Sequence, residues 1–113
     1  MSEKANDTAG HRKRLRERFL KGGGAALADY ELLEMVLFQA QARRDMKPLA
    51  KALLKRFGSF GNVISADPVE LAEIDGAGES VIAALKTIQV AAQRLVHDEV
   101  MDKPILSNWQ RLM

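Results

Sequence analysis

The 113-residue chain contains no cysteine, and aromatic residues make up only 5% of it. Without cysteine, it can form neither disulfide bonds nor thiolate metal sites, and it has no cysteine nucleophile. It also lacks any apolar run near the roughly 18 residues that a membrane-spanning helix requires. The polar, mixed-charge N-terminus has no apolar stretch typical of a signal peptide. These absences favour a cytoplasmic protein with no membrane partner.

Apolar residues make up 47% of the chain, which is enough to fill the core of one domain. We expect three parts: a disordered N-terminus over residues 1–10, a helical domain over residues 11–99, and a final segment over residues 100–113. The final segment is interpreted as a linker followed by the start of a domain that the chain lacks. This interpretation depends on Ser107–Gln110, which is typical of a helix start although it lies three residues before the chain ends.

Charge is distributed in blocks along the chain. Residues 11–21 and residues 43–56 each contain six Lys or Arg against one acid, which gives each block a net charge of +5. Residues 65–80 contain five acids and no base, a net charge of −5. Two basic blocks and one acidic block predict a polarised surface if the blocks face different ways.

Apolar positions three and four residues apart, with capping residues and glycines at the ends, predict a series of helices and no strand. Long helices are expected over about residues 12–21, 30–40, 46–57 and 79–97. Asp29, Ser59 and Asp67 are placed to cap helices, the last two at the start of short ones. The predicted fold is all-α: a compact bundle of five to six helices.

The turn before the last long helix, Gly76-Ala77-Gly78, carries the most informative pattern in the sequence. Two glycines around one small residue allow a sharp turn that leaves N–H groups exposed at the start of the next helix, where they can hold a phosphate. The pattern resembles a helix-hairpin-helix motif. It is equally compatible with a simple tight connection, because Asp75 and Glu79 place acidic groups beside it.

The two preceding long helices resemble a degenerate first hairpin of a tandem helix-hairpin-helix domain. In that interpretation Arg43-Arg44-Asp45 replaces the glycines of the turn. Guanidinium groups then take the place of the backbone amides that a regular hairpin offers.

From about Gly10 to Met113, the chain resembles the N-terminal domain of the RadC family (UPF0758), whose members have long been named DNA repair proteins. The resemblance is carried by eight blocks: Gly10–Arg12, Leu15–Phe19, Leu27–Glu34, Arg43–Asp45, Lys47–Ala50, Arg56–Phe60, Gly76–Gly78 and Pro104–Trp109. The family continues into a JAMM/MPN metal-binding domain, with a His-x-His-Pro-Ser-Gly block among its zinc-site residues. This chain has no such block. The resemblance therefore implies no catalytic residue, metal site or cofactor here.

The charge blocks and the resemblance together predict a nonenzymatic module that binds nucleic acid without sequence preference. The expected phosphate contacts are the hairpin residues Gly76, Ala77 and Gly78 and the basic residues Arg12, Arg14, Arg16, Arg18, Arg43, Arg44 and Lys47. Like charges four residues apart on the first basic helix repel, and an anionic partner relieves that repulsion, although a solvated helix face explains the same pattern.

The competing prediction is a protein–protein adaptor that positions the JAMM/MPN-type domain of longer relatives. In that case the hairpin binds nothing. The acidic residues around the hairpin and the apolar tail Ile105, Leu106 and Trp109 favour this alternative. The two basic blocks favour nucleic acid.

Overall fold

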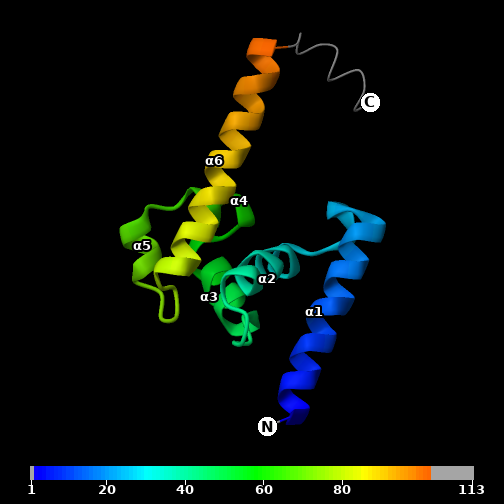
Figure 1. Ribbon diagram of the computed structural model, residues 1–113. Helices are drawn as coiled ribbons and strands as arrows, with labels where there is room; N and C mark the ends of the chain where they lie inside the picture. Colours follow the sequence, from blue (N-terminus) through cyan, green and yellow to red (C-terminus); the bar gives the residue numbers. More distant parts are fainter. Residues whose placement is uncertain (1, 103–113) are drawn as a thin grey trace.

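The computed structural model describes the backbone of residues 2–102 and the side chains of residues 9–101. The described residues form α-helices and one short 3₁₀ helix, with no strand among them (Figure 1). In chain order the elements are α1 (Ser2–Gly22), η1 (Gly24–Ala26), α2 (Asp29–Ala40), α3 (Lys47–Phe57), α4 (Phe60–Ser65), α5 (Pro68–Ala72) and α6 (Glu79–Asp102). The predicted all-α bundle is confirmed.

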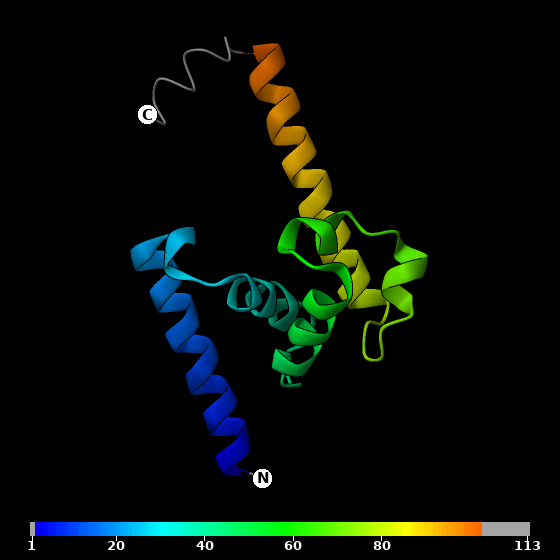
Figure 2. The same cartoon turned by 180° about the vertical axis from the view of Figure 1, so that it is seen from behind.

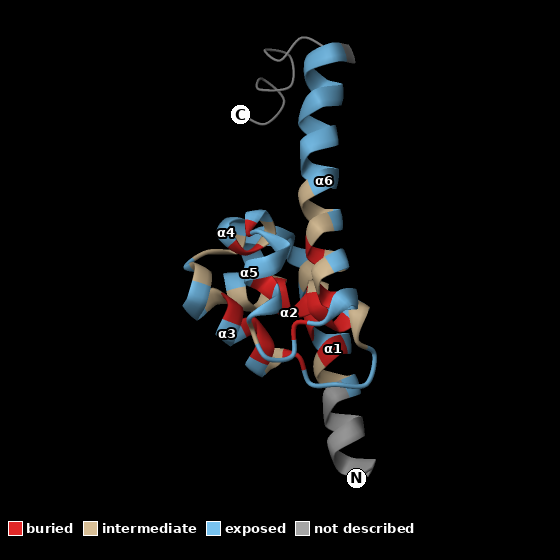
Figure 3. Ribbon diagram, turned by 90° about the vertical axis from the view of Figure 1, so that its left-hand side faces the viewer, coloured by how far each residue is buried: buried red, intermediate tan, exposed pale blue. Residues whose placement is uncertain are grey.

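Helix α2 lies at the centre of the bundle and packs against α1, α3, α4 and α6. This position agrees with its sequence, which is apolar nearly all round and therefore typical of a buried helix. Buried residues, coloured red in Figure 3, gather where these helices meet. The fully buried large side chains are Leu15, Leu33, Leu37, Met46, Leu53, Val63, Leu71, Val81 and Leu85. Aliphatic residues thus fill the core, as the scarcity of aromatics requires.

Helix α1 begins at Ser2, well before the start near Arg12 that was predicted from its apolar positions. Leu15 is buried and Phe19 packs against the core, so these residues anchor the helix to the bundle. The segment before them contains no proline, and nothing in it stops the helix from extending toward the N-terminus. Gly23, with φ of 75°, follows the other end of the helix as expected. The predicted helix start is wrong, while the division into three parts stays a prediction.

The short helices begin where the sequence predicts. The Ser59 hydroxyl accepts the Asn62 N–H at 3.1 Å, and the Asp67 carboxylate accepts the Val69 N–H at 2.8 Å. Asp29, in contrast, does not cap α2, because it is already the first helical residue. Ala28 takes the capping position, and the Glu31 carboxylate accepts its N–H at 3.0 Å. A glutamate three residues into the helix thus replaces the predicted aspartate cap.

Helix α6 extends to Asp102, five residues past the predicted end. Its first half packs against α2, α4 and α5, and its second half extends away from the bundle (Figure 1; Figure 2). From Val90 to Met101 every residue is exposed. The predicted apolar tail and the helix start at Ser107 lie outside the described residues. No described helix combines the length and the apolarity needed to cross a membrane.

Candidate nucleic-acid interface

The hairpin between α5 and α6 turns at Gly76, which has φ of 91°, a conformation that glycine adopts without strain. Gly78 has no positive φ, so the turn does not require glycine there. Ala77 is buried, and its N–H donates to the Ile74 carbonyl at 3.0 Å. That amide is already used inside the turn, and its predicted contact with a phosphate stays a prediction.

The first amides of α6 remain available. The first backbone hydrogen bond of the helix runs from the Ile82 N–H to the Gly78 carbonyl, at 3.0 Å. Within the described part of the chain, the N–H groups of Gly78, Glu79 and Ser80 donate to no protein atom. Such donors at a helix N-terminus attract anions, with help from the helix dipole.

A groove of about 510 Å³ runs along the hairpin. It is lined by residues 72–78 of the hairpin and by Gln41 and Arg44 from the loop between α2 and α3. Two acids belong to this lining, Glu73 and Asp75, and Arg56 pairs with Glu73 at 2.9 Å. The groove thus combines a guanidinium with acidic groups, one of which is neutralised by an ion pair.

Arg44 connects the loop between α2 and α3, which is the basic loop of this site, to the hairpin. Its guanidinium is exposed and donates to the Gly76 carbonyl at 2.8 Å. It also lies 3.1 Å from the point where a Cβ on Gly76 would stand. Arg43, the preceding residue, is also exposed. Lys47 is half-buried and is the first residue of α3, and its backbone N–H donates to Asp45 Oδ1 at 3.0 Å. Of the predicted basic residues, Arg44 contacts the Gly76–Gly78 turn, Arg43 precedes it in the same loop, and Lys47 begins the next helix.

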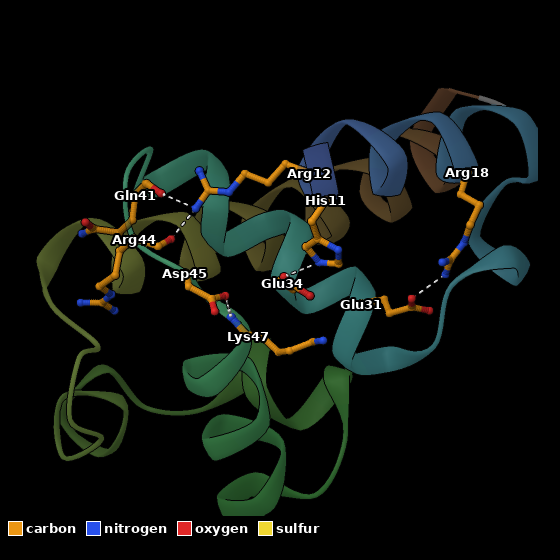
Figure 4. Close-up of polar contacts among 9 residues, drawn as sticks. All are labelled: His11, Arg12, Arg18, Glu31, Glu34, Gln41, Arg44, Asp45 and Lys47. Atoms are coloured by element: carbon orange, nitrogen blue, oxygen red, sulfur yellow. Dashed lines mark hydrogen bonds and ion pairs between the residues drawn. The ribbon is translucent and has the colours of Figure 1, made fainter. Parts of the chain in front are cut away.

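Arg12 does not belong to this surface, although the sequence predicts a phosphate contact there. Its side chain crosses from α1 to the loop after α2, where the residue is only 8% exposed (Figure 4). The guanidinium donates to the carbonyls of Ala42, at 2.5 Å, Gln41, at 3.1 Å, and Arg44. The Arg12 Cζ, the central carbon of the guanidinium, also lies 5.0 Å from the centre of the Phe38 ring. Three hydrogen bonds and its burial hold the Arg12 guanidinium inside the protein, away from a phosphate at the hairpin.

The other arginines of α1 are exposed but scattered. Arg14 folds back over Gly10, and Arg16 lies 5.9 Å from the centre of the Phe38 ring. Arg18 pairs with Glu31 at 2.5 Å, far from Arg44 in the close-up (Figure 4). The pKa of Glu31 is lowered, first by the hydrogen bond from the Ala28 N–H and then by the Arg18 guanidinium. The structure does not bring these three arginines to the hairpin.

Sequence reasoning missed a polar pair between α1 and α2. The Glu34 carboxylate is almost completely buried, at 2% exposure, and its Oε2 lies 2.8 Å from His11 Nε2. Its other oxygen, Oε1, is buried without a hydrogen-bond partner. The signal was present in the sequence, because Glu34 stands between apolar residues in a helix predicted to be central.

The fold and the groove define a small all-α domain in which an arginine-bearing loop meets a Gly-x-Gly turn. Residues 8–83 match the family model described as UPF0758 N-terminal, and the chain belongs to this family. A UPF0758 protein of Rhodobacter capsulatus is 54% identical over 99 residues, which cover 88% of this chain and 46% of the relative. A UPF0758 protein of Ruegeria pomeroyi is 52% identical over 103 residues, which cover 91% of this chain and 46% of the relative.

The chain therefore spans about half the length of the curated relatives that it matches. A comparison with solved structures gives no match.

Proposed function

We propose that this domain binds the phosphate backbone of nucleic acid at the hairpin groove, without reading the base sequence. The observation that carries the proposal is the contact between Arg44 and the Gly76 carbonyl, at 2.8 Å. This contact places a basic loop against a turn whose following amides have no partner in the described protein. Arg44 and Gly78, whose N–H is free, line the same groove, and a cation beside a free N–H donor is an arrangement that binds phosphate.

The donors would act together on one or two neighbouring phosphates. The amides of Gly78, Glu79 and Ser80 stand at the positive end of the α6 dipole, and Arg44, which lines the groove with Gly78, supplies a planar fork of N–H groups. Arg43 from the same loop and Lys47 from the start of α3 add positive charge. Because none of these groups needs a base edge as its partner, binding is expected to be independent of sequence.

The acidic residues at the groove keep the expected affinity low. Arg56 neutralises Glu73, but Asp75 and Glu79 remain close to the site where the phosphate would lie. Like charges raise the free energy of the complex by an amount that salt reduces. We therefore expect weak binding, with a dissociation constant on the order of 10⁻⁴–10⁻⁶ M at physiological salt.

A titration of labelled oligonucleotides with the 113-residue chain tests this function. Fluorescence anisotropy at several salt concentrations gives the dissociation constant and its salt dependence. With Arg43, Arg44 and Lys47 as the cationic contacts, the log–log slope is expected near about −2.7, at about −0.9 per contact. Oligonucleotides of different sequence should give the same values. No binding at low salt, or binding that salt does not weaken, would contradict the proposal.

The second candidate is an adaptor that positions the further domain of longer relatives, which the resemblance to the RadC family implies is of the JAMM/MPN type. The outer half of α6 favours it. Val81 and Leu85 are buried on one face of α6, and that face continues as Val96 and Val100, which are 61% and 50% exposed. An apolar helix face that continues past its own bundle is typical of a surface that another protein segment covers.

The adaptor function is tested by mixing the chain with the separately expressed remaining part of the Rhodobacter capsulatus relative. Calorimetry should detect binding, and the Val96→Asp and Val100→Asp substitutions should abolish it. A matched Ala91→Asp substitution, at an exposed position on the opposite face of α6, separates an added charge from the loss of the apolar face. Binding that all three variants retain would contradict the adaptor function.

A further inference from the structure

Arg12 connects three parts of the fold that the sequence keeps apart. It belongs to α1, its guanidinium contacts the carbonyls of the loop after α2, and that loop carries Arg44 to the hairpin. Arg44 is thus held at both ends. Its backbone carbonyl accepts from Arg12, and its side chain donates to Gly76.

The position of Arg12 matches a physical need of the loop. The loop after α2 lies outside any helix, so the carbonyls of Gln41, Ala42 and Arg44 have no helical N–H to accept from and need other partners. One planar guanidinium satisfies all three, while its face lies against the Phe38 ring. A lysine has neither the fork of donors nor the flat face, so it cannot make the same set of contacts.

We infer that Arg12 is a positioning residue: it sets the conformation of the loop over residues 41–45 and thereby places Arg44 on the hairpin. Its importance for phosphate binding rests on the proposed function, whereas its effect on the loop does not. α1 accordingly contributes to the site through one buried arginine rather than through its exposed basic face. The loop loses its shape when Arg12 is replaced, even by another cation.

The test compares Arg12→Lys, Arg12→Met and a matched control, Lys13→Met, which removes a charge from the neighbouring exposed position. Circular dichroism first confirms that helical content is unchanged. In ¹H–¹⁵N spectra of the free chain, both Arg12 variants should shift the amide signals of residues 41–45 and of Gly76. The control should leave them in place. Unchanged loop signals in Arg12→Lys would overturn the inference.

The second readout is affinity for a labelled oligonucleotide at low salt. Both Arg12 variants should bind about fivefold or more weakly, the lower end of typical coupling between sites, and Lys13→Met less than twofold. In an Arg44→Met background, Arg12→Lys should cause no further loss, because Arg12 acts through Arg44. Affinity restored by Arg12→Lys would show that charge alone is needed, which contradicts positioning.

The two readouts separate this inference from the proposed function. If the unmodified chain binds no oligonucleotide at low salt, the proposed function fails. The amide spectra then decide the inference alone: shifted loop signals in both Arg12 variants support it, and unshifted signals overturn it.

Discussion

Arg44 and Gly76 lie 32 residues apart in the sequence, yet the guanidinium of one donates to the carbonyl of the other at 2.8 Å. The contact is exposed, so Arg44 can exchange the carbonyl for a phosphate at low cost. It also joins the second basic block to the Gly-x-Gly turn, two features that the sequence shows only separately. We therefore place the proposed phosphate site at this hydrogen bond.

Charge reversal at Arg43 and Arg44 is the direct test of the phosphate site. The double variant Arg43→Glu/Arg44→Glu should weaken binding of all oligonucleotides equally, because phosphates carry no base information. It should also reduce the magnitude of the salt slope by about 1.8, since about 0.9 is lost with each cationic contact. Anisotropy titrations at matched salt give both quantities.

The control for this pair is Lys13→Glu/Lys21→Glu, which makes the same change of net charge at two exposed positions of α1 outside the site. We expect a smaller loss of affinity there and an unchanged slope. If both double variants weaken binding by the same factor, the protein attracts nucleic acid through its overall charge and not through the hairpin groove.

Substitution of the two hairpin glycines by alanine should have different effects on stability. Gly76 has φ of 91°, so Gly76→Ala should cost about 1–2 kcal/mol of folding free energy and displace the Arg44 guanidinium, which lies 3.1 Å from the new Cβ. Gly78 has no positive φ and open space around it, so Gly78→Ala should change stability by less than about 0.5 kcal/mol. Denaturant unfolding measures both. An equal effect at the two positions would contradict the described turn.

His11 should matter for stability because it is the hydrogen-bond partner of the buried Glu34 carboxylate. His11→Ala leaves that carboxylate unpaired and should cost about 1–3 kcal/mol. The other histidine is a matched control: His97 lies 3.6 Å from Asp98, and both side chains are about 70% exposed, so His97→Ala should be nearly neutral. Thermal unfolding at pH 7 compares the two. Replacing both members of the pair, as His11→Leu/Glu34→Leu, should recover part of the loss.

The sequence predicted what local patterns and apolar spacing determine. The caps at Ser59 and Asp67 and the long helices follow from residues close in the chain, and the structure contains them. Some local features were nevertheless predicted wrongly: the start of α1, the Asp29 cap and the end of α6. What the sequence cannot show at all is a role that depends on distant partners. Arg12 is one of six basic residues in its block, and nothing local distinguishes it from its exposed neighbours; only the folded chain brings it to the carbonyls after α2.

The lowered pKa of Glu31 predicts how the stability of the folded protein depends on pH. Its pKa is lowered in the folded protein by the Ala28 N–H and by Arg18, so folding favours the ionised carboxylate. A lowered folded pKa contributes stability that is fully present above the ordinary glutamate pKa, about 4.3, and is lost as the pH falls through the lower folded value. Glu31→Gln removes the charge and should cost about 0.5–1 kcal/mol at pH 7, the range for an acid at a helix N-terminus. Thermal unfolding should show that difference shrinking to near zero in acid.

The matched variant Glu17→Gln, at an exposed position of α1, should show no such pH dependence. A gap between wild type and Glu31→Gln that stays constant down to low pH would exclude ionisation as its cause.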